Sequence, residues 1–547
     1  MKIQTILIGI ISFIVGYFLI GQNLEAKWFY VDDHEIPNFL QGKNRLALTD
    51  IPVALRETEF YSFGKGARFR PVYSLFRVTE TFLWGTNPTV WYMARFIMFV
   101  CSFAILWIIL RNYTGYILGF LILMYTMTFP YWKDIWARMG PGEIYCVPAF
   151  SLFLWSFIKL LEGKKDVIYW IALTISSVIA IGSKETFAFL LILIIFLNCV
   201  LIYRKQINRQ AIIFSFLILG YISYILMGVG LYMYGTGNDF YLNSVDTQSR
   251  ILNLATTLSN TFMRVWKKVY PYKLIGIGIV SFFSLFWVYL QIKKAKKTEK
   301  SLYGKALWQL VWTLGLTGIM VASQIYFYNG TWPTRMRYDF PGLLAIPISM
   351  TAFYLFLRTL FLTDKKLLFY HLLPYFFGIL LLGGILKIGY GQLILASDIN
   401  VTRTIEFTTR LETIKKDVSM LNKAPILYES CNPGDYEFIT SLNRFLYKEL
   451  HTHTIFLMTD YTAYTFTSAL DTHLGESLVA TSKNGNDIFR PLEEKKTDTD
   501  CYSINFSCPE MHCSQGMSLV QPWCISRSNP RYTSPYRTKV PNSDCVL

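Results

Sequence analysis

The chain has 547 residues, of which 53% are hydrophobic and only 16% are charged. Soluble globular proteins carry roughly 25% charged residues, so this composition excludes an ordinary soluble protein and predicts a polytopic membrane protein with a polar part. The formal net charge of +16 does not predict nucleic-acid binding, because Lys and Arg of membrane proteins gather in cytoplasmic loops beside anionic lipid.

About eleven apolar segments are long enough to span a bilayer, which takes roughly 20 residues. The first begins with Lys2 and lacks a small-x-small cleavage site, so we interpret it as a retained signal anchor. The predicted spans are 3–21, 92–110, 113–131, 144–160, 167–183, 185–203, 211–233, 272–292, 306–328, 339–360 and 367–389.

Basic residues are concentrated in alternate connections between these spans, which the positive-inside rule assigns to the cytoplasm. These connections contain Arg111, "KLLEGKKD", "YRKQINR", "KKAKKTEKSLYGK" and "RTLFLTDKK". The N-terminus is therefore predicted to lie in the cytoplasm. An odd number of spans then places residues 390–547 on the periplasmic side of a cytoplasmic (inner) membrane.

An acidic segment follows the first span in "WFYVDDHEIPNFL" (28–40), which contains Asp32, Asp33 and Glu35. The orientation places it outside, in the long loop 22–91. Such a segment is either a solvated loop or the acid–base end of an active site, because a positioned carboxylate can take a proton from an attacking hydroxyl. The choice depends on which other charges lie on that side.

Other charged residues near the ends of apolar segments fall on the same predicted side. Arg70 precedes "PVYSLFRVTETFLWG" (71–85), whose apolar spacing predicts a helix on the membrane face. Asp134, Arg138 and Glu143 surround a "MGPGE" turn, whose glycines allow a ligand to approach the backbone. These loops therefore combine several carboxylates with several cations.

Charged residues at membrane depth are costly and indicate a function or an ion pair. Lys184 and Glu185, in "GSKET", are either an interfacial ion pair or an anion-binding Lys184 oriented by Glu185. Arg335 and Arg337, followed by Tyr338, are either snorkelling anchors or a planar fork of donors for phosphate oxygens.

The charges suit one reaction class, the transfer of a group from a phosphorylated lipid to a hydroxyl. A carboxylate accepts the proton of the attacking hydroxyl, and Arg and Lys stabilise the phosphate leaving group. Because nucleotides are not available outside the membrane, a lipid-linked sugar is the expected donor. A transporter or flippase of such a lipid is the alternative, although internal repeats and helices broken near the midplane, which are typical of transporters, are not visible. An inactive scaffold is a third alternative.

Four motifs resemble those of GT-C glycosyltransferases, in particular the protein O-mannosyltransferases and the transmembrane O-mannosyltransferases that carry tetratricopeptide repeats. The motifs are "FYVDDHEI", "RFRPVYSLFRVTETFLWGTNPTVWYMARF", "GSKETFAF" and "RMRYDFPGLLAIP". Each is short, but they occur in the order of the family and on one predicted side, and the resemblance covers roughly residues 1–390. It implies a GT-C fold and inverting transfer from a polyprenyl-phosphate sugar by a hexosyl- or pentosyltransferase.

The resemblance also implies roles for individual residues. Asp32 or Asp33 would be the general base, with Asp32 the better match, and the donor phosphate would contact Lys184, Arg335, Arg337 and Arg70. The residues that would orient the acceptor are Glu35, Asp134, Arg138, Glu143, Glu185 and Tyr338. No cofactor is required; a divalent cation, Mg²⁺ or Mn²⁺, is optional and would be held by Asp33 and Glu143.

The chain departs from these relatives in having neither tetratricopeptide repeats nor a β-trefoil insertion. A protein acceptor is therefore no more expected than an envelope glycan or a lipid. The expected partners are the lipid-linked donor, membrane lipids and one of these acceptors.

The polar residues 391–547 are predicted to form an extracytoplasmic α/β domain that follows a transmembrane catalytic domain at 1–390. "INVTRTIEFTTRLETIKKDVSML" and "DYEFITSLNRFLYKELH" predict helices, and "APILYES" and "TIFLMTD" predict strands. A metal site is the less favoured interpretation of four residues in this part: His451, His453, Asp460 and His473.

The cysteines divide between the two parts. Cys101, Cys146 and Cys199 lie in apolar segments and are interpreted as small core side chains. Six more lie in the polar part and predict disulfides in an oxidising compartment, rather than a zinc site, because no CxxC pair is present. They are Cys431, Cys501, Cys508, Cys513, Cys524 and Cys545.

Overall fold

The structure is a computed structural model that divides into two compact units. Unit 1 comprises residues 1–22, 52–76 and 93–397, and unit 2 comprises residues 23–51, 77–92 and 398–547. The residues that the structure describes are 2–30, 33–64, 69–129, 132–236, 252, 255–256, 297–328, 337, 340–363, 367–388, 391–420, 426–430, 436–446, 455–459, 478–482, 501–506 and 539–540.

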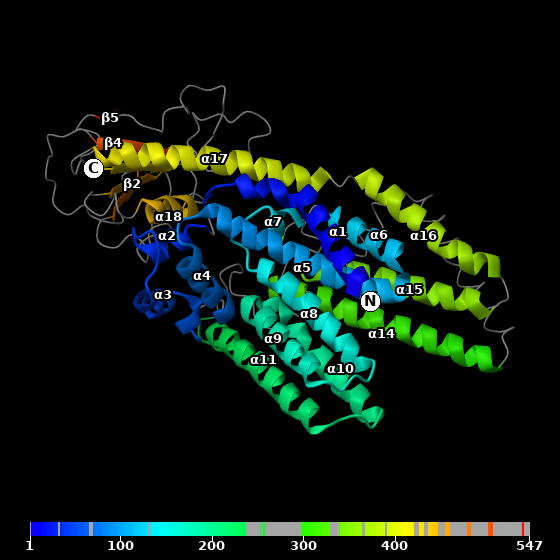
Figure 1. Ribbon diagram of the computed structural model, residues 1–547. Helices are drawn as coiled ribbons and strands as arrows, with labels where there is room; N and C mark the ends of the chain where they lie inside the picture. The colour runs from blue at the N-terminus through cyan, green and yellow to red at the C-terminus, as the bar shows by residue number, and fades with distance from the viewer. Residues whose placement is uncertain are drawn as a thin grey trace. The chain divides into compact units, whose positions relative to one another are not determined.

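Long apolar helices form most of unit 1 (Figure 1). They are α1 (Lys2–Ile20), α5 (Pro88–Thr114), α6 (Tyr116–Met127), α8 (Glu143–Leu161), α9 (Val167–Ser183), α10 (Leu190–Tyr203), α11 (Arg209–Thr236), α14 (Lys297–Tyr328), α15 (Gly342–Thr363) and α16 (Leu367–Ile388). Each predicted span in the described part of the chain corresponds to one of them, and the span predicted at 272–292 lies outside that part.

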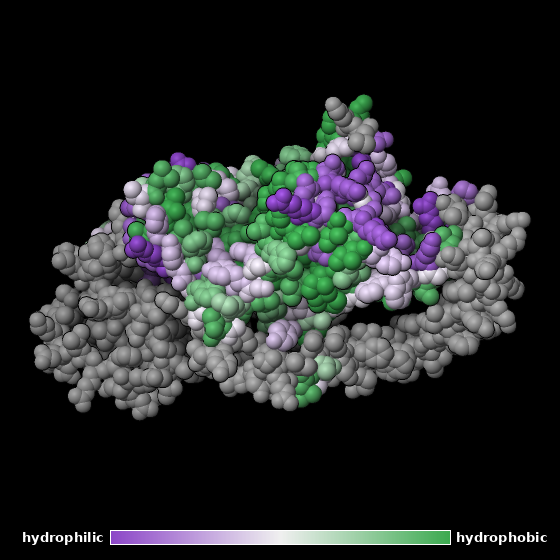
Figure 2. Space-filling model, turned by 90° about the horizontal axis from the view of Figure 1, so that it is seen from below, coloured by the Kyte–Doolittle hydropathy of each residue, from purple (hydrophilic) through white to green (hydrophobic). Residues whose placement is uncertain are grey.

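The composition of these helices confirms a multi-pass membrane protein. In the described residues, eight helices are long and apolar enough to cross a membrane, and α6 and α9 are shorter apolar helices. Large apolar side chains lie exposed, among them Ile3, Phe216 and Tyr375. On the face shown in Figure 2, hydrophobic side chains cover wide areas between hydrophilic patches. A soluble monomer rarely exposes such areas, whereas lipid solvates them.

Helices α8 and α9 pack side by side, and α11 packs against α9 (Figure 1). The close approach depends on Gly182, near the end of α9. A Cβ atom there would lie 2.4 Å from Cγ2 of Val72 and 2.5 Å from the hydroxyl oxygen of Tyr221. A side chain at this position would push these elements apart, so the glycine sets the distance at which the end of α9 packs.

Short helices occupy the loops that the sequence predicts to lie outside. They are η1 (Gly21–Glu25), α2 (Glu35–Leu40), η2 (Leu48–Asp50), α3 (Ile51–Arg56), η3 (Glu59–Tyr61), α4 (Pro71–Trp84), α7 (Lys133–Trp136) and η5 (Glu185–Phe189). Helix α4 confirms the helix predicted over 71–85.

Within unit 2, the segment after α1 lies against α17 (Gly391–Ser419). The backbone N–H of Lys27 donates to Oγ1 of Thr404 over 2.9 Å. Buried Asn400 donates to Oδ1 of Asn23 over 2.8 Å, and it accepts two hydrogen bonds from Arg403, the shorter 2.8 Å. These buried polar groups satisfy one another, as groups removed from water must, and they fix this segment on the helix.

In the described residues after α17, five strands form a sheet in the order β3-β2-β1-β4-β5. Its four longer strands are parallel, and β5 pairs antiparallel with β4. The strands are β1 (Ile426–Ser430), β2 (Ile455–Thr459), β3 (Leu478–Ser482), β4 (Cys501–Phe506) and β5 (Lys539–Val540), and α18 (Tyr436–Phe445) connects β1 to β2. The predicted strand–helix–strand order, and with it the α/β class of this part, is confirmed.

The cysteine interpretation needs one correction. Cys146 is buried, but Cys101 and Cys199 are exposed on their helices. The disulfides stay a prediction, since the described residues include only Cys501 of the six polar-part cysteines, and the four proposed metal ligands of that part also lie outside them.

Candidate functional site

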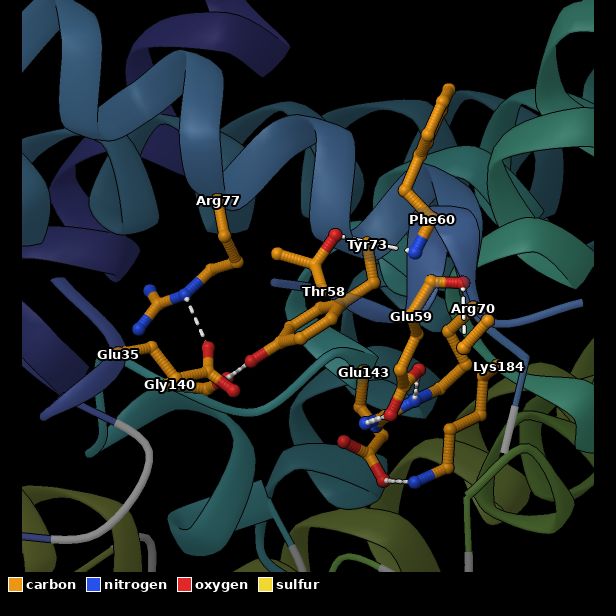
Figure 3. A network of polar contacts seen from close by, with 11 residues as sticks. Glu35, Thr58, Glu59, Phe60, Arg70, Tyr73, Arg77, Gly140, Glu143 and Lys184 are labelled. Carbon is orange, nitrogen blue, oxygen red and sulfur yellow. Dashed lines mark hydrogen bonds and ion pairs between the residues drawn. The ribbon is translucent and has the colours of Figure 1, made fainter. Parts of the chain in front are cut away.

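A buried ion pair lies at the ends of two helices of unit 1. Nζ of Lys184 is 2.7 Å from Oε1 of Glu143, and the two side chains are 5% and 1% exposed (Figure 3). Glu143 begins α8 directly after the Gly-Pro-Gly turn. Lys184 directly follows α9, and its extended backbone (φ −155°) ends that helix. The turn and the helix end together bring the two side chains to one place.

A second ion pair joins the loop before α4 to η3. Arg70 donates from Nη2 to Oε1 of Glu59 over 2.6 Å and from Nε to Oε2 over 2.8 Å, a bidentate geometry (Figure 3). Its guanidinium lies 4.8 Å from the ring centroid of Tyr73. Burial disfavours the charged form of Arg70, but the Glu59 carboxylate outweighs this effect, and the pKa of Arg70 lies well above its usual value. Glu185 adds to the same electrostatic stabilisation.

These charges belong to one cluster. Arg337 acts electrostatically on Glu143, and Arg70, Glu143, Lys184 and Glu185 all act on the thiol of Cys146. The cluster thus joins predicted site residues from the loop before α4, the start of α8, the α9–α10 connection and the segment before α15. The neighbouring Glu185 was the expected partner of Lys184, and Glu143 was expected to orient the acceptor. In the structure, Lys184 instead forms its ion pair with Glu143.

Buried polar atoms without a hydrogen-bond partner adjoin the cluster. They are Oγ of Ser183, Oε2 of Glu185 and Oγ1 of Thr186, in residues that are 0%, 7% and 0% exposed. Buried polar groups are normally hydrogen-bonded, and exceptions need an explanation. A polar ligand that donates and accepts hydrogen bonds would satisfy all of them.

Aromatic side chains pack around Phe187, which closely follows Lys184 and Glu185 in the chain. The ring of Phe187 contacts those of Phe150, Phe189 and Phe340, with centroids 5.4–5.7 Å apart, and Trp132 contacts Phe340 at 6.1 Å. These rings surround the η5 segment with apolar surface. Electrostatic interactions in the cluster are therefore stronger than they would be in water.

Two residues that the sequence analysis did not single out hold the Gly-Pro-Gly turn. The hydroxyl of Tyr73 donates to the carbonyl of Gly140 over 3.1 Å. Buried Arg95, on α5, donates to the carbonyl of Met139 over 3.3 Å and to the hydroxyl of Tyr145 over 3.1 Å. An Arg inside the apolar run "WYMARFIMF" was a signal for such a role, because a charge there needs partners.

The acidic segment belongs to unit 2. Asp33 is 3% exposed, and its Oδ2 accepts the backbone N–H of Phe29 over 2.9 Å. Glu35 begins α2 and pairs with Nε of Arg77 over 3.2 Å; the Arg77 side chain is 1% exposed and that of Glu35 is 29% exposed (Figure 3). Asp32 lies outside the described residues.

The remaining predicted site residues are placed as follows. Asp134 lies in α7 and Arg138 is the second residue after it, and both are half-buried. Arg335 and Tyr338 lie outside the described residues. Within the described part of the chain, no group of three or more His, Cys, Asp or Glu side chains could hold a metal. Of the optional ligands, Glu143 is engaged by Lys184 and Asp33 by a backbone amide.

The helices and the cluster define a multi-pass membrane protein with a buried charged site at its helix ends. No protein-family model matches the chain, and no curated protein matches it. It is similar to two solved structures of ArnT from Cupriavidus metallidurans, both at 12% identity. The structure bound to undecaprenyl phosphate has a TM-score of 0.39, with 93% of each chain covered; the apo structure has 0.40, with 92% covered. These values are too low to relate individual residues of the chains.

Proposed function

We propose that the protein is an inverting glycosyltransferase of the GT-C type, which moves a sugar from a polyprenyl-phosphate donor to a hydroxyl on the extracytoplasmic face of the membrane. The acceptor is an envelope glycan, a lipid or a protein. The observation that carries the proposal is the convergence of Arg70, Lys184 and Arg337 on the buried cluster of a membrane protein, together with the family motifs to which these residues belong.

The cluster is suited to a phosphorylated ligand. When the sugar leaves, negative charge grows on the lipid phosphate, and cations held in surroundings of low dielectric stabilise that charge strongly. Buried ion pairs are often no more stable than apolar residues in their place. A structural role alone therefore does not explain a Lys184–Glu143 pair at 1–5% exposure.

The base that accepts the proton of the acceptor hydroxyl is assigned to Asp32. It matches the first acid of the family motif, and the neighbouring carboxylate of Asp33 is buried and occupied by the backbone N–H of Phe29. Glu35, with its partly exposed carboxylate beside Arg77, is assigned to the acceptor.

The test is consumption of a panel of short-chain polyprenyl-phosphate sugars by the purified protein in detergent. Wild type is compared with Asp32→Asn and Lys184→Gln, and Lys159→Gln is the control, because Lys159 forms an exposed pair with Glu162 at the far end of α8. We expect consumption by wild type and the control and its loss in the other two. If both variants consume donor at the wild-type rate, the assignment is wrong. Movement of an intact lipid-linked sugar across vesicles, without sugar transfer, would instead indicate a flippase.

A further inference from the structure

A large cavity in unit 1 has no part in the proposed site. It has a volume of about 960 Å³ and lies between α5, α8, α10, α14 and α15. Its walls are mainly Leu, Ile, Val, Phe and Met side chains, such as Leu110, Phe157 and Met320. Phe150 contributes both to this wall and to the aromatic side chains beside η5.

The size and polarity of the cavity indicate an apolar occupant. Protein interiors are close-packed, with few voids larger than a water molecule. Filled with liquid water, this volume would hold roughly thirty molecules at about 30 Å³ each, but a buried water needs polar partners, which apolar walls do not supply. Apolar cavities that stay dry are several-fold smaller, about 150 Å³. Hydrocarbon chains fit the walls.

One end of the cavity is different. It is lined by Tyr113 at the end of α5, by Tyr203 and Arg204 at the end of α10, and by Lys305 and Trp308 in the first part of α14. Tyr203 is 89% exposed and Trp308 is 61% exposed. Tyr and Trp at the ends of membrane helices are typical of the level of the lipid head groups. This end is therefore at a membrane surface.

The charged side chains that line this end are basic, and the nearby carboxylate of Glu162 accepts a hydrogen bond from the Tyr113 hydroxyl and pairs with Lys159. Arg204 and Lys305 are both exposed, and among the described residues that line the cavity there is no Asp or Glu. Arg204 donates one hydrogen bond to the carbonyl of Leu161, which holds its guanidinium above the end of α8 while other donors stay available. Basic pockets between membrane helices are typical binding sites for anionic lipid head groups.

We propose that this cavity binds an anionic phospholipid of the bilayer. Its phosphate contacts Arg204 and Lys305, and its acyl chains fill the space between α10, α14 and α15. This lipid is distinct from the sugar donor, whose phosphate is assigned to Lys184 near the opposite ends of α8 and α10. The proposal does not depend on glycosyl transfer, because binding of the lipid stabilises the protein whatever its activity.

The experiment is lipid binding to the purified full-length protein in detergent, followed by native mass spectrometry with phosphatidylglycerol and phosphatidylcholine in competition. The charge variant is the double substitution Arg204→Gln and Lys305→Gln. Its matched control is Lys165→Gln with Arg209→Gln, two exposed basic residues that do not line the cavity. A third variant, Ala352→Phe, fills the cavity from α15 without a change in charge.

We expect wild type and the matched control to prefer phosphatidylglycerol, and the preference to fall roughly 5-fold for each cation removed. Ala352→Phe should weaken the binding of both lipids, because it removes room for their chains. The proposal is overturned if wild type shows no preference for the anionic lipid, or if the charge variant keeps it. It is also overturned if Ala352→Phe binds lipid as wild type does, since the chains would then lie elsewhere.

Discussion

The charged cluster of unit 1 and the acidic segment of unit 2 differ in how far water reaches their ion-paired carboxylates. In unit 1, Glu143 is 1% exposed and lies 2.7 Å from a Lys184 that is itself 5% exposed. In unit 2, Arg77 is equally buried, but its partner Glu35 keeps 29% of its side chain exposed. A carboxylate that water reaches can exchange protons, whereas a buried and paired one holds a cation in place.

The comparison suggests different roles for the two regions in the proposed reaction. The cluster of unit 1 offers cations in surroundings of low dielectric, where they interact strongly with an anion. An anionic ligand that contacts Lys184 must compete with Glu143 for it, so the affinity reflects the difference between the two contacts. Of the described carboxylates of the acidic segment, Asp33 is buried, whereas Glu35 is 29% exposed, and its exposure suits proton transfer.

The largest expected effect comes from breaking the buried pair. Lys184→Met leaves Glu143 as an unpaired charge in the interior, and we expect the free energy of unfolding to fall by about 3–5 kcal/mol. The double variant Lys184→Met with Glu143→Leu removes both charges and should regain most of that loss. Sugar transfer should be absent in both variants. Denaturant unfolding in detergent and the donor-consumption assay provide the two measurements.

The exposed pair Lys159–Glu162, at 2.7 Å and 23% and 39% exposure, is the control for that comparison. Lys159→Met should cost no more than about 1 kcal/mol, because solvent screens such pairs. A double variant as unstable as Lys184→Met alone would contradict the idea that each charge of the buried pair is balanced by the other.

In unit 2 the two adjacent acids are expected to behave differently. Asp32→Asn should reduce the rate of sugar transfer on the order of 100- to 10,000-fold, the usual contribution of a general base, with little change in stability. Asp33→Asn keeps an oxygen that can accept the N–H of Phe29 and should retain most of the activity, at a cost of about 1 kcal/mol in stability. Transfer rates and thermal unfolding of both variants are compared; loss of activity only in Asp33→Asn would reverse the assignment.

Sequence patterns predicted the helices well because each span is a long apolar run, which has few alternative structures in a membrane. The strand–helix–strand order of the polar part was also predicted, from the short apolar runs that became β1 and β2. The structure brings Arg70, Glu143, Lys184, Glu185 and Arg337 into one charged cluster, and the roles that the sequence motifs imply for them stay predictions.

The sequence did not predict which charged side chains form ion pairs with one another. Lys184 is adjacent to Glu185 in the chain but forms its ion pair with Glu143, because the helix end at Lys184 and the turn before α8 determine the contact. Glu59 was not predicted to hold Arg70, since the sequence between the two residues has no regular apolar pattern. The exposure of Cys101 and Cys199 likewise depends on which helix faces meet, and uniformly apolar helices do not reveal that.

A smaller effect is expected at the turn that positions Glu143. Tyr73→Phe removes the hydrogen bond from the Tyr73 hydroxyl to the carbonyl of Gly140 and should lower the free energy of unfolding by about 1 kcal/mol. If the turn positions the cluster, the rate of sugar transfer should also fall at temperatures well below unfolding, where the variant is still fully folded. Tyr17→Phe, at a position that is 62% exposed, should change neither quantity; equal effects of both substitutions would exclude a role for this bond.

The smallest effect concerns an exposed carboxylate of unit 2, which contrasts with Glu143. The backbone N–H of Ala47 and the ammonium of Lys43, each 2.9 Å from Asp50, lower the pKa of that carboxyl. Since the pKa is lower in the folded state, the resulting stabilisation is complete above the unfolded-state pKa, about 3.9, and is lost as the pH falls through the folded-state pKa. Asp50→Asn should therefore unfold at a slightly lower temperature than wild type at pH 6, and the gap should narrow towards pH 3. Solvent screens this pair, so the difference in unfolding temperature from wild type should be small. A difference as large as that of Lys184→Met, or one that widens in acid, would contradict the idea that the exposed pair contributes less to stability than the buried one.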